Sequence, residues 1–272
     1  MTKLLKNLLT AAGALALLAA SGFGQMLDNQ EKTMTCDEHN HWNRLATHCE
    51  IKEQTMPASS GAIQINPGSN GGITVKGWNR SDMLVRAKIE TAASSDAEAR
   101  GLVSQVRFAS GSGHLVAEGP NTDENHHWSV SYEIFVPHQT DFEATTHNGG
   151  VHVQDVKGTL TFTTTNGGVH LARLAGRVTG HTSNGGVHVE LAGDRWDGTG
   201  LDVETTNGGV HMNVPSAYSA HVETSTVNGG LNVDFPVTVQ GHVTKALSFD
   251  IGGGGPTVRV TTTNGGVHIQ KT

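Results

Sequence analysis

At residues 148–153 the chain reads Asn148-Gly149-Gly150-Val151-His152-Val153, and close copies of this stretch return along its second half. Asn-Gly-Gly followed by an apolar residue also begins at positions 166, 184, 207, 228 and 264, with an outlying copy at 70. The spacings after Asn148 are 18, 18, 23, 21 and 36 residues. A period near 18 is shorter than the common helical repeats, which run to about 33 residues or more, and it suits one coil of a β-solenoid. The last spacing is twice 18, which predicts one unmarked coil between Asn228 and Asn264.

Each repeat unit predicts a tight corner followed by short strands. Asn-Gly-Gly supplies the positive φ that such a corner demands. A short alternating strand follows, as in Val151-His152-Val153, and a second one comes next, as in Leu160-Thr161-Phe162. Alternation with period 2 indicates that one side of each strand is buried. The predicted corner residues are Asn148, Gly149, Gly150, Asn166, Gly167, Gly168, Asn184, Gly185, Gly186, Asn207, Gly208, Gly209, Asn228, Gly229, Gly230, Asn264, Gly265 and Gly266.

Stacked coils and a series of β-hairpins compete to explain this pattern. Asn-Gly is a strong hairpin signal, but hairpins do not explain why identical residues recur at a coil-length spacing. Stacked coils do, because like residues then lie above one another about 4.8 Å apart. We therefore predict an all-β parallel solenoid of about seven short coils. The residues expected to point into its core are Leu160, Phe162, Val203, Val222 and Val260.

The region before the repeats differs in pattern. Residues 59–140 contain several expected strands and one short helix, which Ser95 opens as a cap and which runs to about Val106. This region is expected to continue the same sheet system and to cap the first coil, since repeat proteins need a terminal cap for solubility. The predicted organisation is a signal peptide at 1–24, a disulfide-bearing segment at 25–58, a β-rich N-terminal cap at 59–140 and the solenoid at 141–272.

Composition excludes several classes of protein. Glycine makes up 35 of 272 residues, but with only 7 prolines and no strict Gly-X-Y period the chain is not collagen-like. Charged residues are 16% of the chain, and the formal net charge is −7. No basic patch large enough to indicate nucleic-acid binding follows from that balance.

The N-terminus predicts export. Lys3 and Lys6 precede an apolar run at residues 8–20, and small residues follow at 21–24. This order is typical of a secretory signal peptide, and the apolar run is short of the roughly 20 residues that span a membrane. No later stretch is long and apolar enough to span one. We expect an exported protein that is periplasmic, displayed at the cell surface or secreted.

The chain has two cysteines, Cys36 and Cys49. Export favours a disulfide between them. Closing that loop is worth roughly 3 kcal/mol on the chain-entropy account. The alternative is a metal site, because His39, His41 and His48 lie in or beside the same loop. The spacing matches neither C-x2-C nor H-x3-H pairs, so the disulfide is the favoured prediction.

Several short motifs accompany the repeats: Cys36 with Cys49-Glu50, Ile73-Thr74-Val75-Lys76-Gly77-Trp78, Ala117-Glu118-Gly119-Pro120, Trp128-Ser129-Val130-Ser131-Tyr132 and Gly252-Gly253-Gly254-Gly255. Together with the Asn-Gly-Gly-Val-His units, they give the chain a resemblance to a bacterial family of exported domains of unknown function that are often labelled adhesins. The resemblance covers nearly the whole exported chain. It implies a right-handed parallel β-helix-like solenoid and export, and it supplies no catalytic residues.

Motifs for catalysis and cofactors are absent from the sequence. It contains no G-x-S-x-G, H-E-x-x-H, Walker loop or C-x-x-C, and no cofactor is implied. The best candidate for polysaccharide chemistry is the insertion that stretches one repeat to 23 residues. There Asp194 and Asp197 would be an acid/base pair and Trp196 would stack on a sugar. The alternative is a solvated loop whose tryptophan folds back over an apolar edge.

Histidines form a second repeated feature. In each Asn-Gly-Gly-Val-His-Val unit the valines should point inward and the histidine outward. The coils are expected to align His152, His170, His188, His211, Asn232, Asp250 and His268 in one column. The histidines of such a column could bind transition metals or respond to pH, and their closeness should lower some of their pKa values below about 6.5. The alternative is that histidine is one of several tolerated outward residues.

These observations favour a non-enzymatic, adhesin-like scaffold that presents flat solenoid faces to a protein or glycan partner at the cell envelope. The alternatives are a polysaccharide-binding or polysaccharide-cleaving protein centred on Trp196, and a metal-binding or pH-responsive protein using the histidine column. The strand at residues 267–272 has no following segment to cover it, which predicts weak self-association through that edge.

Overall fold

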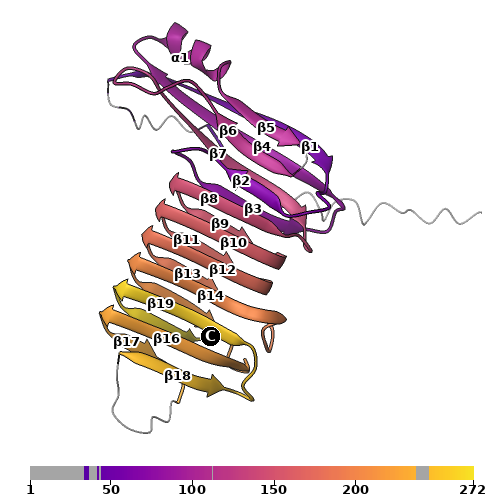
Figure 1. Ribbon diagram of the computed structural model, residues 1–272, viewed down its shortest axis with the longest axis vertical. Helices are drawn as coiled ribbons and strands as arrows, with labels where there is room; N and C mark the ends of the chain where they lie inside the picture. Colours follow the sequence, from indigo (N-terminus) through magenta and orange to yellow (C-terminus); the bar gives the residue numbers. More distant parts are fainter. Residues whose placement is uncertain (1–33, 37–41, 43, 112, 237–244) are drawn as a thin grey trace, which may run out of the picture. The chain divides into compact units, whose positions relative to one another are not determined.

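The repeats fold as stacked rungs, each built from one strand, an Asn-Gly-Gly corner and a second strand. The computed structural model describes residues 34–36, 42, 44–111, 113–236 and 245–272, all within one unit, Met34–Thr272 (Figure 1). The predicted signal peptide at 1–24 lies outside the described residues. Within them the chain forms two ten-stranded sheets.

We call the two sheets A and B. Sheet A contains, in spatial order, β1 (Ala46–Pro57), β4 (Asp82–Ala93), β7 (His127–Pro137), β3 (Ile73–Trp78), β9 (Val151–Gln154), β11 (Val169–Ala172), β13 (Val187–Glu190), β15 (Val210–Val214), β20 (Val267–Lys271) and β17 (Leu231–Val233). Sheet B contains β18 (Ala246–Ile251), β16 (Ala220–Asn228), β19 (Thr257–Asn264), β14 (Gly198–Asn207), β12 (Ala175–Asn184), β10 (Lys157–Asn166), β8 (Phe142–Asn148), β2 (Ile63–Asn66), β6 (His114–Glu118) and β5 (Arg107–Gly111).

Register confirms the solenoid and excludes the hairpins. Strands of successive rungs pair in parallel with like residues opposite one another, as Asn148, Asn166 and Asn184 do. The region before the repeats joins the same sheets, because β2 pairs with β8 and β3 pairs with β9. The expected helix is α1 (Asp96–Val103), where the Ser95 side chain accepts a hydrogen bond from the backbone N–H of Glu98. Among the described residues, no helix has the length and apolar character needed to cross a membrane.

The core lies between the two sheets and follows the alternation. All five residues predicted to point inward are at most 2% exposed, and side chains from both sheets join one apolar cluster. Phe162 and Gly180 are register partners on β10 and β12. A Cβ on Gly180 would lie 2.0 Å from the Phe162 ring, so this ring fills the space that the glycine leaves.

The corners are held by close packing and by two ladders of hydrogen bonds. A Cβ on Gly167 would lie 2.0 Å from the carbonyl oxygen of Gly149, so the first corner glycine is needed for close backbone approach. Among the predicted corner residues only Gly265 has a positive φ, and its value of 159° is close to extended backbone. The predicted reason, a positive φ at the corner, is therefore wrong.

Asparagine side chains form the first ladder. From the second member on, each Nδ2 donates to the Oδ1 of the asparagine before it in the ladder at 2.7–2.9 Å, in the order Asn70, Asn148, Asn166, Asn184, Asn207, Asn264 and Asn228. The outlying copy at Asn70 is thus the first member of the ladder.

Buried threonines form the second ladder, two residues before each corner asparagine. Their Oγ1 atoms donate to a glycine carbonyl of the neighbouring rung at 2.8–2.9 Å. The ladder consists of Thr146, Thr164, Thr182, Thr205, Thr226 and Thr262.

The rungs do not stack in sequence order at the C-terminal end. Strand β19 pairs in parallel with both β14 and β16, so the last rung enters between the two before it (Figure 1). The chain between β17 and β19 includes β18, which pairs antiparallel with β16 at the edge of sheet B. The predicted unmarked coil between Asn228 and Asn264 is therefore wrong.

The same insertion overturns the predicted self-association through the last strand. Strand β20 pairs with β15 on one side and β17 on the other, so residues 267–271 lie inside sheet A. The edges at this end are β17 and β18. A strand that is paired on both sides offers no free edge to another chain.

Candidate functional site

A row of histidines crosses the outer face of sheet A, the face opposite the core. The flanking residues on β11, Val169 and Leu171, are at most 1% exposed, and alternation therefore turns His170 outward. The other members occupy the same position on their own strands. In spatial order the row contains His152, His170, His188, His211, His268 and Asn232.

Asp250 was predicted in the same column and lies elsewhere. It is on β18 in sheet B, where its Oδ1 lies 2.7 Å from Nδ1 of His221. The prediction is wrong because the 36-residue spacing contains an antiparallel edge strand and not a second coil.

Ring contacts distinguish three of these histidines from the others. The ring centroids of His152 and His170 lie 4.8 Å apart with planes inclined by 3°. Those of His170 and His188 lie 5.3 Å apart and are inclined by 29°. We call these three residues the histidine stack. His211 and His268 meet edge to face, with centroids 5.8 Å apart.

The histidine stack lines a depression of about 250 Å³ in the outer face of sheet A. Thr74, Gln154 and Glu190 add polar side chains to its wall. The Glu190 Oε1 lies 3.4 Å from Nη1 of Arg173, a residue that also donates two hydrogen bonds to Asp155. Imidazole nitrogen and carboxylate oxygen are ligand types that divalent transition ions accept.

The pKa of one member of the row, His152, is lowered, and the closeness of the imidazoles is not the main cause. Burial lowers the pKa of His152 from its ordinary value of 6.5, and the nearby charges of His170 and Lys76 lower that pKa further. The neutral imidazole, which offers a lone pair to a ligand, is therefore favoured at neutral pH.

The same row continues through the N-terminal part of sheet A as Thr74, Glu133, Arg86 and Glu53. The side chain of Glu133 is 1% exposed, and it accepts hydrogen bonds from Arg86 and, at 2.9 Å, from Nζ of Lys76. Arg86 Nε also donates to Glu53 at 2.7 Å. Removing one member would leave a buried charge uncompensated, so this ion network fixes the chain beside the stack.

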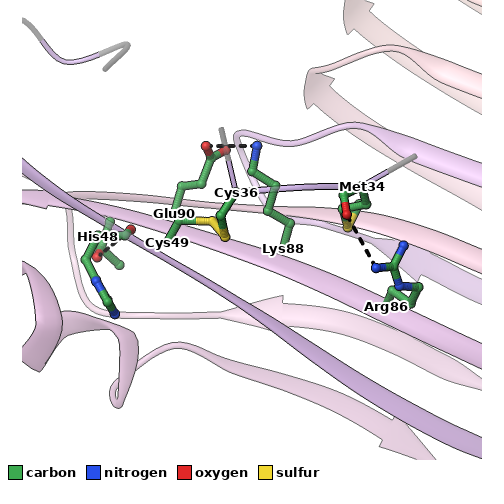
Figure 2. The surroundings of a disulfide bond; sticks show 8 residues. Met34, Cys36, His48, Cys49, Arg86, Lys88 and Glu90 are labelled. Carbon is green, nitrogen blue, oxygen red and sulfur yellow. Dashed lines mark hydrogen bonds and ion pairs between the residues drawn. A yellow bond between two sulfur atoms is a disulfide. The ribbon is translucent and has the colours of Figure 1, made fainter. Parts of the chain in front are cut away.

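The predicted disulfide between Cys36 and Cys49 is confirmed (Figure 2). It overturns the alternative metal site, which needs free cysteines and whose residues 39–41 lie outside the described residues. Arg86 Nη2 donates to the carbonyl oxygen of Met34 at 3.4 Å. The short segment that carries Cys36 is thus tied to sheet A beside the buried ion network.

The structure does not support the predicted sugar platform at Trp196. This side chain is 2% exposed and belongs to the apolar core, and its Nε1 donates to the carbonyl oxygen of Gly176 at 2.9 Å. A buried ring cannot stack on a sugar, so the alternative, in which the tryptophan folds back over an apolar edge, is correct. Asp197 pairs with Lys157 at 2.6 Å, and Asp194 lies 3.6 Å from Arg195.

A depression on sheet B was not predicted from the sequence. It measures about 480 Å³ and is lined by Arg177, Thr179, Asp202, Glu223 and Arg259, among others. Arg259 Nη1 donates to Asp202 at 2.9 Å, and its Nε lies 3.9 Å from Glu223. The insertion of β19 between β14 and β16 brings these three residues together. Polar residues alternating along each strand were the only signal for this face in the sequence.

The similarity to known proteins extends over nearly the whole described chain. The family model described as Toastrack DUF4097, a domain of unknown function, matches residues 45–270. A solved structure titled a "putative cell adhesion protein", from Clostridium sporogenes, is 13% identical, with 84% of this chain and 100% of that chain covered and a TM-score of 0.40. A "putative adhesin" from Bacteroides fragilis is 11% identical, with 82% and 97% covered and a TM-score of 0.36. No curated protein matches the chain.

Proposed function

The chain belongs to the Toastrack DUF4097 family, and on that premise we propose that it is an exported, adhesin-like scaffold without enzymatic activity. It binds a protein or glycan partner at the cell envelope through the outer faces of its solenoid. The proposal rests first on how those faces are built and second on the chemistry of the cysteines.

The observation that carries the proposal is the depression on sheet B. Its floor is formed by strands of adjacent rungs, so its side chains are spaced by the rigid register of the sheet. Threonine hydroxyls, arginine guanidinium groups and carboxylates together offer donors and acceptors to a hydroxyl-rich or charged ligand. Such a surface suits recognition of a polar partner along several rungs.

Export is supported by the disulfide. Disulfides persist in oxidising compartments and are rare in the cytosol. The predicted signal peptide points the same way. The family assignment adds no catalytic residues, which favours binding over chemistry.

A glycan array tests the binding surface with a matched pair of variants. Thr179→Tyr fills the sheet B depression from an exposed position without touching the core. Thr145→Tyr places the same ring at an exposed position on β8, outside that depression. We expect defined glycans to be retained by the wild type and by Thr145→Tyr, and lost by Thr179→Tyr. Equal glycan binding by both variants would contradict the assignment of this surface.

Cell fractionation tests the compartment. The full chain, expressed in a bacterium, is expected in the exported fraction with Cys36 and Cys49 oxidised. Recovery in the cytoplasm with both thiols free would overturn the envelope role, whatever the array shows.

A further inference from the structure

The histidine stack repeats at a position where the fold accepts other residues. In the same row, β17 carries Asn232 and β3 carries Thr74. Both side chains occupy regular rungs with no change of register. Histidine on five adjacent strands, with stacked rings on three of them, is therefore not explained by strand pairing, and a ligand is the alternative explanation.

We propose that neighbouring imidazoles of the histidine stack bind a divalent transition-metal ion, Cu²⁺ or Zn²⁺, in the depression of sheet A. His170 belongs to both possible pairs, with His152 on one side and His188 on the other. It is therefore the residue on which binding depends most.

The spacing between rungs suits a shared ion. Two imidazole nitrogens on one ion, at about 2.0–2.1 Å each, lie at most about 4.2 Å apart. The ring centroids lie 4.8 Å apart for His152 and His170 and 5.3 Å apart for His170 and His188. Tilting the rings about their side-chain torsions brings the nitrogens within reach, and the second pair is already inclined by 29°.

The remaining ligands come from solvent. Within the part of the chain that the structure describes, no three His, Cys, Asp or Glu side chains already converge on one point. The site is therefore a pair of imidazoles completed by water, which is open coordination that Cu²⁺ and Zn²⁺ both tolerate. For nitrogen ligands the order of affinity favours Cu²⁺.

Selectivity for the ion comes from the imidazoles, because the charge around the depression is close to balanced. The Glu190 carboxylate lines it and lies 3.4 Å from Nη1 of Arg173, and Lys76 on the neighbouring strand pairs with Glu133. Hard ions such as Mg²⁺ prefer oxygen ligands and keep their waters, so the imidazole pair discriminates against them.

Isothermal titration of the purified, tag-free protein with Cu²⁺ alone, and separately with Zn²⁺ alone, tests the proposal at neutral pH. We expect His170→Asn to weaken binding at least about tenfold, since it removes a direct ligand from both pairs. Asparagine is the matched replacement because Asn232 already occupies this row. Circular dichroism establishes that each variant is folded.

Two control variants locate the ion. His114→Asn changes an exposed histidine on β6 in sheet B, and His211→Asn changes the row outside the stack. Both are expected to keep the wild-type affinity. Unchanged affinity in His170→Asn, or an equal loss in either control, would overturn the assignment.

Electron paramagnetic resonance of the Cu²⁺ complex adds a readout that does not depend on affinity. Nitrogen hyperfine structure from two imidazoles is expected in the wild type, and from one in His170→Asn. A spectrum showing oxygen ligands alone would refute the proposal.

Discussion

Two features of this solenoid repeat in the same register, and different forces hold them. The Asn-Gly-Gly corner has an asparagine ladder, a threonine hydrogen bond and a glycine under close backbone contact in rung after rung. The histidine row has ring contacts along part of its length and accepts asparagine or threonine at other rungs. The corner repeats because the fold requires it, whereas the histidines exceed what the fold requires.

Residues therefore repeat in this chain for two different reasons. A repeated residue with a steric or hydrogen-bonding reason at every rung reports on folding. A repeated residue without one reports on the surface and on what that surface binds.

The largest effect is expected at the corner glycine. Gly167→Ala places a Cβ 2.0 Å from the Gly149 carbonyl oxygen, and two backbone segments must separate to admit it. We expect a loss of more than about 4 kcal/mol in the free energy of unfolding, measured by denaturant titration. Gly168→Ala is the matched control, because its Cβ would lie 3.6 Å from the nearest atom. Equal stability of the two variants would show that close approach does not explain the corner.

An intermediate loss of stability is expected in the core, where substitutions are tolerated best when the total side-chain volume is conserved. Phe162→Ala is expected to cost about 3–5 kcal/mol, because it leaves a cavity beside Gly180. Gly180→Ala alone should cost about 1–3 kcal/mol by overpacking against the Phe162 ring. The double variant should lose less stability than the sum of the two single losses, since the new methyl group enters the space that the phenylalanine ring leaves. Strict additivity in a denaturant-based double-mutant cycle would argue against this packing.

The threonine ladder predicts a smaller effect. Thr164→Val removes the hydrogen bond from Oγ1 to the Gly149 carbonyl while keeping the shape of the side chain. The expected cost is about 1 kcal/mol in the free energy of unfolding. Thr163→Val, at the exposed neighbouring position, should be close to neutral. If the threonine hydrogen bonds did not stabilise the fold, Thr164→Val and Thr163→Val would have the same free energy of unfolding.

The smallest effect on stability is expected in the histidine row. His170→Asn should change the metal-free free energy of unfolding by less than about 0.5 kcal/mol, because the position is exposed and the row already accepts asparagine. Denaturant titration in the presence of a chelator measures this value. A cost as large as that of Thr164→Val would mean that ring stacking stabilises the fold.

The sequence predicted the parts of the fold that depend on local pattern. Period-2 alternation placed Phe162 and Val203 in the core, and the 18-residue spacing placed His152, His170 and His188 in one row. These predictions succeed because alternation and coil length are properties of a single strand or rung.

The features that were missed depend on which rungs become neighbours. A spacing of 36 residues fits two coils as well as one rung plus an antiparallel edge strand, so neither the position of β19 nor that of Asp250 could be read from it. The sheet B depression around Arg259 was missed for the same reason. The alternation in β7 marks Glu133 as outward-facing, yet ion pairs with Lys76 and Arg86 on neighbouring strands bury it.

Thermal unfolding with and without Zn²⁺ tests the separation of the two repeats most directly, using the wild type, Thr164→Val and His170→Asn. The account predicts that Thr164→Val melts at a lower temperature than the wild type but keeps its full zinc-induced rise in Tm. It predicts that His170→Asn melts like the wild type without metal and loses that rise. If His170→Asn lowered the metal-free Tm as much as Thr164→Val does, or kept the wild-type zinc effect, the histidine row would not be the separate ligand site described here.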